Sequence, residues 1–150
     1  MRVLVQKVRQ AKVSVAGKVS GEIAHGLLLL VGIENNDDES DLSWTAKKVC
    51  NLRIFEDEAQ VMNRSVLDCQ GDILAVSQFT LFASYTKGNR PSWGKAAKAE
   101  ISQPLFNRFV SKLSELVAKP VPTGVFGAEM QVELINDGPV TLMLDSKNPE

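Results

Sequence analysis

A run of turn-forming residues near the end of the chain limits the folds open to this sequence. Residues 136–141 read Asn-Asp-Gly-Pro-Val-Thr, and strand-like runs flank them at 126–135 and 140–144. Asn, Asp, Gly and Pro in succession are a strong turn signal, and the simplest interpretation is a tight hairpin. The Gly138–Pro139 bond could also be cis, because only X-Pro bonds have a cis form within about 1 kcal/mol of trans.

A second polar stretch follows an apolar run that is typical of a buried strand. Ile-Leu-Ala-Val at 73–76 leads into Ser77, Gln78, Phe79 and Thr80. Open sheets place their ligands at the carboxyl ends of such strands. The alternative is that Ser77 and Thr80 are ordinary strand-end residues whose hydroxyls cap backbone groups.

Length and composition indicate one globular domain. The chain has 150 residues, 44% hydrophobic and 23% charged, which is ordinary for a globular protein. The longest strongly apolar run, 26–33, is shorter than the roughly 20 residues that a membrane helix needs. The N-terminus alternates like a strand and has no signal-peptide pattern, so we expect a cytoplasmic protein without a membrane partner. Cys50 and Cys69 lack a CxxC spacing and are expected to be free thiols.

The charge pattern argues against a protein that grips nucleic acid over its whole surface, because the formal net charge is −1. Cations nevertheless cluster locally. Lys87, Arg90, Lys95 and Lys98 occur with no acidic residue between 85 and 99, and Tyr85 and Trp93 are interleaved with them. This pattern favours a local surface for phosphates and bases, although a solvated loop would look the same.

The order of elements predicts an α/β fold in a single domain, with mixed β-sheets packed in layers and two main helices on one side. Period-two alternation indicates strands at 2–9, 12–16, 19–24 and 126–134, and apolar runs indicate strands at 26–33, 52–56 and 71–77. Helical periodicity predicts one helix after 35–38 and a second from 102 to 118, with Pro104 in its first turn.

The two polar stretches together resemble the signatures of the D-aminoacyl-tRNA deacylase family, Ser-Gln-Phe-Thr and Asn-x-Gly-Pro-Val-Thr. The likeness covers residues 1–145, which we interpret as the deacylase domain, and leaves a polar tail at 146–150. Further matching segments lie at 26–28, 53–55, 62–63, 87–88, 90–92, 123–124 and 130–132.

The resemblance implies an editing hydrolase. The expected reaction is cleavage of the ester of D-aminoacyl-tRNA, and also of glycine mischarged on tRNA(Ala), to free amino acid and tRNA. It implies a homodimer in which a cis Gly138–Pro139 segment enters the partner's active site and leaves no room for an L side chain. The catalytic positions would be Thr80 and Phe79. The substrate-binding positions would be Ser77, Gln78, Gly138, Pro139, Asn136, Thr141 and Met130, and tRNA would be bound by Lys87, Arg90 and Lys95.

The residues themselves offer little conventional catalytic machinery. We find no metal-ligand spacing, no phosphate-binding glycine loop and no nucleophile elbow, so no cofactor and no metal are expected. Neither polar stretch holds a His, Cys or Lys that could activate Ser77 or Thr80. Asp137 could act as a base, but an Asx-type turn is its more ordinary role. The resemblance implies instead that backbone groups and the 2′-hydroxyl of the terminal adenosine assist the reaction.

Two departures from the family pattern stand out. Lys7 occupies a position where the family usually has arginine, which puts the geometry of the Gly-Pro loop in question because lysine lacks the planar fork. Trp93 stands where phenylalanine is usual, which we interpret as neutral. Two alternatives remain open: a nucleic-acid-binding module without catalysis, and an unspecific esterase that uses Thr80 or Ser77.

Overall fold

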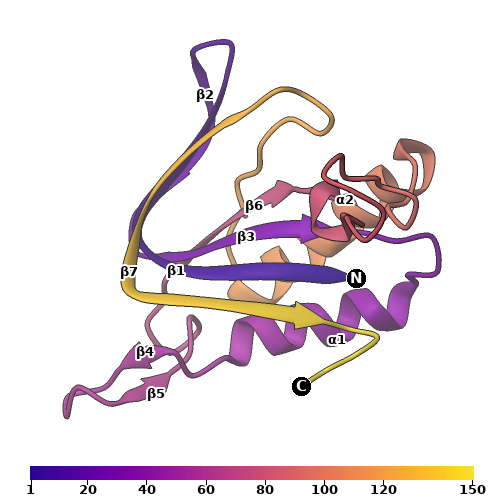
Figure 1. Cartoon of the computed structure of the whole chain (residues 1–150). Coiled ribbons are helices and arrows are strands. Elements are labelled where there is room, and N and C mark those ends of the chain that lie inside the picture. The colour runs from indigo at the N-terminus through magenta and orange to yellow at the C-terminus, as the bar shows by residue number, and fades with distance from the viewer.

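Strand β1 (Arg2–Val15) is the strand on which the main sheet is built. Three strands pair with it in antiparallel fashion: β2 (Lys18–Ile23), β3 (Gly26–Gly32) and β7 (Gln131–Asp145). Strand β6 (Asp72–Ser77) runs parallel to β3 and completes a five-stranded mixed sheet. The computed structural model describes all residues, 1–150, and Figure 1 shows the arrangement.

β1 is one continuous strand, whereas the sequence predicts two strands at 2–9 and 12–16. Its first half pairs with β3, its second half pairs with β2, and β7 follows both halves. The pairing with β7 is irregular on both sides of Val8, which lies just before the gap at 10–11 between the two predicted strands. The sheet therefore bends in the middle of β1 instead of ending there, as Figure 1 shows.

The hairpin interpretation of residues 136–141 is wrong. β7 runs as a single strand through this stretch, and both of its arms pair with the same neighbour, β1. The predicted strand at 126–134 also begins later, at Gln131. A hairpin would have paired the two arms with each other, so the turn residues instead form a bulge in one long strand.

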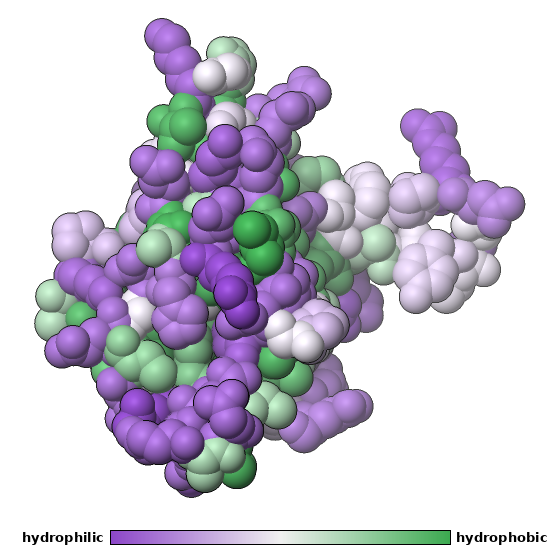
Figure 2. Space-filling model, turned by 90° about the vertical axis from the view of Figure 1, so that its left-hand side faces the viewer, coloured by the Kyte–Doolittle hydropathy of each residue, from purple (hydrophilic) through white to green (hydrophobic).

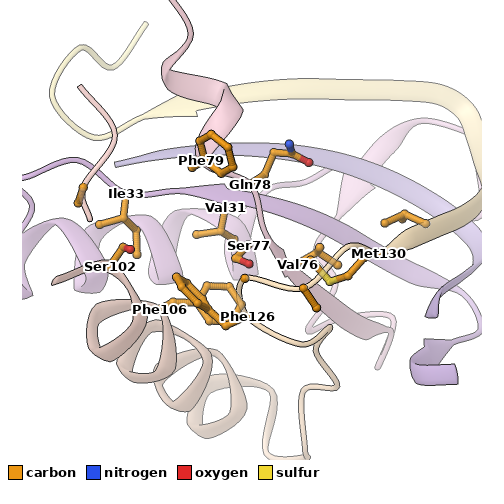
Figure 3. A pocket seen from close by; sticks show the side chains of 14 residues that line it. Val31, Ile33, Val76, Ser77, Gln78, Phe79, Ser102, Phe106, Phe126 and Met130 are labelled. Carbon is orange, nitrogen blue, oxygen red and sulfur yellow. The ribbon is translucent and has the colours of Figure 1, made fainter. Parts of the chain in front are cut away.

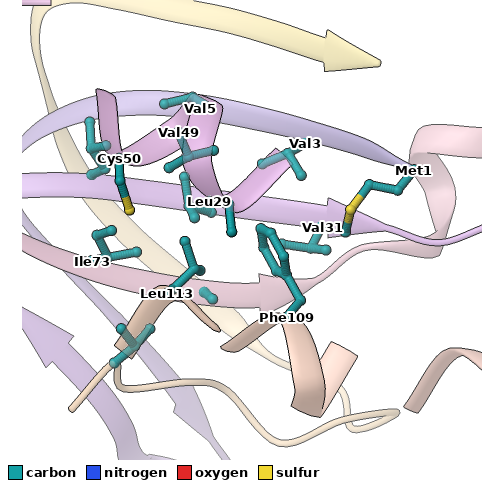
Figure 4. Packing of buried hydrophobic residues seen from close by; sticks show 14 of the residues in the cluster. Met1, Val3, Val5, Leu29, Val31, Val49, Cys50, Ile73, Phe109 and Leu113 are labelled. Atoms are coloured by element: carbon teal, nitrogen blue, oxygen red, sulfur yellow. The ribbon is translucent and has the colours of Figure 1, made fainter. Parts of the chain in front are cut away.

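Both helices lie against the same face of the sheet, which confirms the predicted α/β layers. Helix α1 (Glu39–Asn51) is capped by the residue before it, Asp38, whose carboxylate accepts hydrogen bonds from the backbone N–H groups of Ser40 and Asp41. Figure 4 shows side chains from β1, β3, α1 and α2 interlocking in the core. One stripe of α1, at the helical spacing expected from the sequence, is buried there: Leu42, Thr45, Ala46, Val49 and Cys50.

Helix α2 (Ala99–Val117) begins three residues earlier than predicted. Pro104 therefore lies in the second turn, not the first, and Ser102 is buried and donates to the Lys98 carbonyl at 3.0 Å. The helix ends at Ala118, which has a left-handed conformation with φ of 55°. Neither helix is long and apolar enough to cross a membrane.

The remaining elements are small. Strands β4 (Phe55–Glu56) and β5 (Met62–Arg64) form a short hairpin, so the strand predicted at 52–56 is shorter than expected and the loop after it contains a strand.

The first two residues of the polar tail after β7 are hydrogen-bonded to the rest of the domain. Ser146 donates its N–H to the Met1 carbonyl at 2.9 Å, and the Lys147 ammonium donates to the Asp41 carboxylate at 2.6 Å.

Candidate active site

A cavity of about 260 Å³ lies between the end of β6, the start of α2 and the segment that leads into β7. Figure 3 shows the rings of Phe106 and Phe126 side by side on one wall, with Val31 and Ile33 across from them. The two ring centroids are 6.0 Å apart. Fourteen residues line the cavity: Val31, Ile33, Val76, Ser77, Gln78, Phe79, Ala97, Ser102, Phe106, Phe126, Gly127, Ala128, Met130 and Val132.

The parallel pairing of β6 with β3 places the Ser-Gln-Phe-Thr stretch at the mouth of this cavity. The register aligns Ser77 with Val31, and the Gln78 N–H donates to the Val31 carbonyl at 2.7 Å. The chain then turns into a short 3₁₀ helix (Phe79–Phe82). Its first N–H groups lack helical partners, because no preceding turn supplies acceptors.

Three residues of the predicted stretch line the cavity, and Thr80 does not. Thr80 is half-buried in the 3₁₀ helix, and its hydroxyl accepts a hydrogen bond from the side-chain amide of Gln78. Phe79 is 55% exposed at the rim. The predicted substrate-binding residue Met130 also lines the cavity.

The chemistry of the lining is nearly apolar. Its only polar side chains are those of Ser77, Gln78 and Ser102, and none of the fourteen residues is ionisable. A serine or threonine nucleophile would need an adjacent base, and the lining provides none. No three His, Cys, Asp or Glu side chains anywhere in the chain lie close enough together to hold a metal ion. The side chains that line the cavity are therefore mostly apolar, with two hydroxyl groups and one carboxamide among them.

Sequence reasoning missed most of the cavity wall. The helical spacing of Phe106 indicates a core residue, and Phe106 is buried, but its ring also faces the cavity. Phe126 was assigned to a strand and lies in the irregular segment before β7. Periodicity reports only that a side chain points inward, so it does not separate a core wall from a cavity wall.

The Gly138–Pro139 segment forms a braced, exposed bulge on β7. Gln6 pairs with Thr141 and Val8 with Asn136, so four residues of β7 stand opposite Lys7 alone. The Asn136 carboxamide accepts from the Val140 N–H at 2.9 Å and donates to the Thr141 hydroxyl at 2.7 Å. These two bonds close the bulge across its base.

Within the bulge, the Gly138–Pro139 peptide bond is cis. Gly138 has φ of +133°, and a Cβ there would lie 2.7 Å from Val140 Cγ2, so the position requires glycine. Asp137 forms an ion pair with Arg9, with an Nε to Oδ1 distance of 3.1 Å, and the pair lies at the surface. Gly138 and Pro139 are both exposed.

The two signature stretches do not meet within one chain. None of the residues from 136 to 141 lines the cavity. In Figure 1 the bend of β7 and the end of β6 lie toward opposite sides of the molecule. Figure 2 looks at the side with the bend, where hydrophobic patches interrupt a mostly hydrophilic surface. Ile135, Leu142 and Met143 of β7 are large apolar side chains exposed to solvent.

Lys7 lies directly beneath the bulge and is only 1% exposed. Its ammonium group donates to the Glu56 carboxylate at 2.7 Å and lies 5.9 Å from the centroid of the Phe55 ring. The hydrogen bond from Lys7 lowers the pKa of Glu56 below its usual value. The lysine at this departure from the family pattern is therefore held by the β4–β5 hairpin.

The predicted tRNA-binding residues lie on one loop beside the cavity. Lys87, Arg90 and Lys95 are all exposed. Ser84 and Ser92 exchange two backbone hydrogen bonds of 2.8 Å, which close the part of the loop that holds Lys87 and Arg90, and Lys95 follows this closure. The loop therefore presents its cations to solvent from a fixed base.

Comparison with known proteins gives a consistent result. A family model described as D-Tyr-tRNA(Tyr) deacylase matches residues 4–145. Proteins named D-aminoacyl-tRNA deacylase are 64% identical in Chromobacterium violaceum and 55% identical in Bacteroides thetaiotaomicron, each over the whole of both chains.

Solved structures share the fold. The structure of a protein named c-Myc DNA Unwinding Element Binding Protein is 39% identical, with a TM-score of 0.90, and the alignment covers 97% of this chain and 98% of the other. A probable eukaryotic D-amino acid tRNA deacylase is 18% identical with a TM-score of 0.82, covering 95% and 97%. At that identity the second likeness concerns the fold alone.

Proposed function

The chain belongs to the D-Tyr-tRNA(Tyr) deacylase family, and from this membership we propose that it hydrolyses the ester of D-aminoacyl-tRNA to free D-amino acid and tRNA. The observation that carries the proposal is the family match over residues 4–145. The cavity at the end of β6 supports it, because Ser77, Gln78 and Phe79 of the signature line that cavity.

The ester reaction fits a site without ionisable side chains. Water attacks the ester carbonyl, the carbonyl oxygen becomes negative, and the ribose oxygen leaves with a proton. The backbone N–H groups of Phe79 and Thr80, at the start of the 3₁₀ helix, stabilise the oxyanion. The 2′-hydroxyl of the terminal adenosine assists the proton transfer. We assign Thr80 a positioning role and not that of the nucleophile, because its hydroxyl is engaged by the Gln78 side chain and none of the residues that line the cavity is a base.

Selection between D and L substrates comes from a second copy of the chain. In a homodimer, the bulge with Gly138 and Pro139 of one subunit enters the cavity of the other and excludes an L side chain by contact. Support comes from the bulge itself, which is exposed, braced by Asn136 and absent from its own cavity. The exposed apolar side chains of β7 give such a dimer a surface to bury. Glycine has no side chain to exclude, so glycine mischarged on tRNA(Ala) is also a substrate.

The tRNA itself is held by the loop beside the cavity. Lys87, Arg90 and Lys95 are exposed there and bind phosphates of the acceptor end. Binding should therefore weaken steeply as salt increases, whichever amino acid the tRNA carries.

Deacylation of matched D-tyrosyl-tRNA and L-tyrosyl-tRNA by the purified protein tests the proposal. We expect rapid loss of the D form alone, and Thr80→Ala should retain most of the activity. Equal loss of both forms, together with inactive Thr80→Ala, would support the unspecific esterase instead. Binding of tRNA without turnover would support a nucleic-acid-binding module, and the 39% identical protein is named for binding a nucleic acid.

A further inference from the structure

The exposed ring of Trp93 lies against Phe79 at the rim of the cavity. The two ring centroids are 5.4 Å apart, and the ring planes meet at 83°, an edge-to-face pair. Trp93 is 37% exposed and Phe79 55% exposed. Figure 3 places Phe79 on the opposite side of the cavity from Phe106 and Phe126. The pair therefore forms a part of the cavity rim that is exposed to solvent.

Backbone bonds hold Trp93 in place from both sides. Ser92, the residue before it, exchanges two hydrogen bonds of 2.8 Å with Ser84. On the other side, the Ala96 N–H donates to the Trp93 carbonyl at 3.0 Å, and the Ala97 N–H donates to the Ile33 carbonyl at 2.9 Å. The ring is thus presented from a fixed backbone, so little further ordering is needed when a ligand stacks on it.

The geometry of the pair leaves an aromatic face free. In an edge-to-face pair one ring contributes only its edge, so its partner covers neither of its faces. Flat bases stack on such faces with little regard to sequence, and each stacked base contributes about 1–3 kcal/mol. The cations Lys87, Arg90 and Lys95 on the same loop supply contacts for the phosphates on either side of a stacked base.

We propose that the Trp93–Phe79 pair is a stacking site for the base that precedes the terminal adenosine of the tRNA 3′ end. This inference rests on the proposed function. The ester must lie beside the Phe79 and Thr80 amides, so the terminal nucleoside occupies the cavity and the strand leaves over Phe79. The next base then meets Trp93, and its phosphates meet the loop. Trp93 is in this way a binding residue, and phenylalanine at the same position would offer a similar aromatic face.

The test uses tryptophan fluorescence and unacylated RNA, so it does not depend on turnover. The chain has two tryptophans, and Trp44 lies on α1 beside Lys48. A Trp44→Phe protein thus reports on Trp93 alone, and a Trp93→Phe protein reports on Trp44. The probe is an RNA hairpin with the tRNA acceptor end, compared with one that is abasic at the penultimate nucleotide.

We expect the intact hairpin to quench Trp93 but not Trp44. The abasic hairpin should bind about tenfold more weakly and quench less, as loss of one stacked base predicts. Trp93→Ala should bind the intact hairpin about tenfold more weakly than the unaltered protein does, and should bind the two hairpins equally. Trp93→Phe should retain most of the preference for the intact hairpin. Circular dichroism of each variant checks that it is folded.

Two results would overturn the stacking site. One is equal binding of both hairpins by the unaltered protein. The other is an undiminished preference for the intact hairpin in Trp93→Ala. Deacylation of D-tyrosyl-tRNA is measured alongside, so that a working enzyme without the stacking preference refutes only this inference, whereas absence of turnover refutes the proposed function.

Discussion

The guanidinium group of Arg2 ties Asp145, at the end of the last strand, to the helical turn beside the cavity. Its Nε lies 2.9 Å from Asp145 Oδ2, and its Nη1 donates to the Leu81 carbonyl at 3.0 Å. The same group lies 4.8 Å from the centroid of the Phe82 ring. One side chain of β1 therefore fixes the turn that carries Phe79 and Thr80.

Replacing Arg2 should slow the reaction more than it weakens binding. Arg2→Ala frees the turn, so we expect kcat for D-tyrosyl-tRNA to fall about tenfold with a smaller change in KM, because misplaced groups impair the transition state most. Arg2→Lys should recover part of the rate, since an ammonium can reach one of the two oxygens. Arg108→Ala, which removes a surface contact between α2 and Glu39, is the control. Equal effects of Arg2→Ala and Arg108→Ala would contradict the positioning role.

The ion pair between buried Lys7 and exposed Glu56 should respond asymmetrically to loss of its two partners. Glu56→Gln leaves the Lys7 ammonium buried without a counter-charge, and we expect it to lower the free energy of unfolding by about 2 kcal/mol. Lys7→Met leaves only Glu56, which is 42% exposed and can be hydrated, so its effect should be smaller. Urea unfolding of both variants and the double variant measures this. A larger loss in Lys7→Met than in Glu56→Gln would refute the assignment.

Asn136 should control selectivity more than stability. Asn136→Ala removes the bonds to Val140 and Thr141 that close the bulge, and we expect the ratio of D to L deacylation rates to fall. Asn136→Asp keeps an acceptor for the Val140 N–H but loses the donor to Thr141. Its ratio of D to L deacylation rates should therefore lie between those of the unaltered protein and Asn136→Ala. Asn107→Ala on the exposed surface of α2 is the matched control. An unchanged ratio in Asn136→Ala would separate this residue from selection.

The contact between Asp41 and the tail should make stability depend on acid. Burial opposes ionisation of Asp41, but hydrogen bonds from Lys147, Ser146 and the Asp38 backbone outweigh it and lower its pKa to about 2. The unfolded chain takes up this proton near the ordinary value of 3.8. The stabilisation is thus complete above about pH 4 and is lost as the pH falls toward 2.

Urea unfolding at several pH values between 6 and 2.5 measures this effect. We expect Asp41→Asn to be less stable than the parent at pH 6 and to have a flatter pH dependence below pH 4. Glu115→Gln, an exposed acid on α2, should leave the curve unchanged. If the free energy of unfolding of Asp41→Asn fell with pH as steeply as that of the parent, other carboxylates would be responsible for the acid sensitivity.

Local patterns were enough to predict the helices and the buried strands. The apolar residues from Leu42 to Cys50 recur at helical spacing, which fits a helix and not a strand. The continuous apolar run of β3 is typical of a strand that is buried on both faces. The resemblance supplied the cis bond at Gly138–Pro139, which the structure contains. In each case the information lies within a few neighbouring residues.

The sequence at 136–141 predicts a hairpin where the structure has a bulge, because the same turn-forming residues occur in both structures. Asn, Gly and Pro report that the backbone turns, but the partner of each arm is decided elsewhere. That partner is β1, whose 14 residues are long enough to pair with both arms of β7. The burial of Lys7 was missed for the same reason, since it depends on a hairpin about fifty residues away.

The cavity and the bulge of one chain do not meet, and this separation has a genetic consequence. If the site is shared between two copies, a subunit with a damaged bulge still has a sound cavity, and a subunit with a damaged cavity still has a sound bulge. A mixed pair then assembles one complete site from two defective proteins. Two defective alleles, one that loses D/L selection through a change near Asn136 and one that loses turnover through a change near Phe79, would together yield a dimer with one site that is both active and selective.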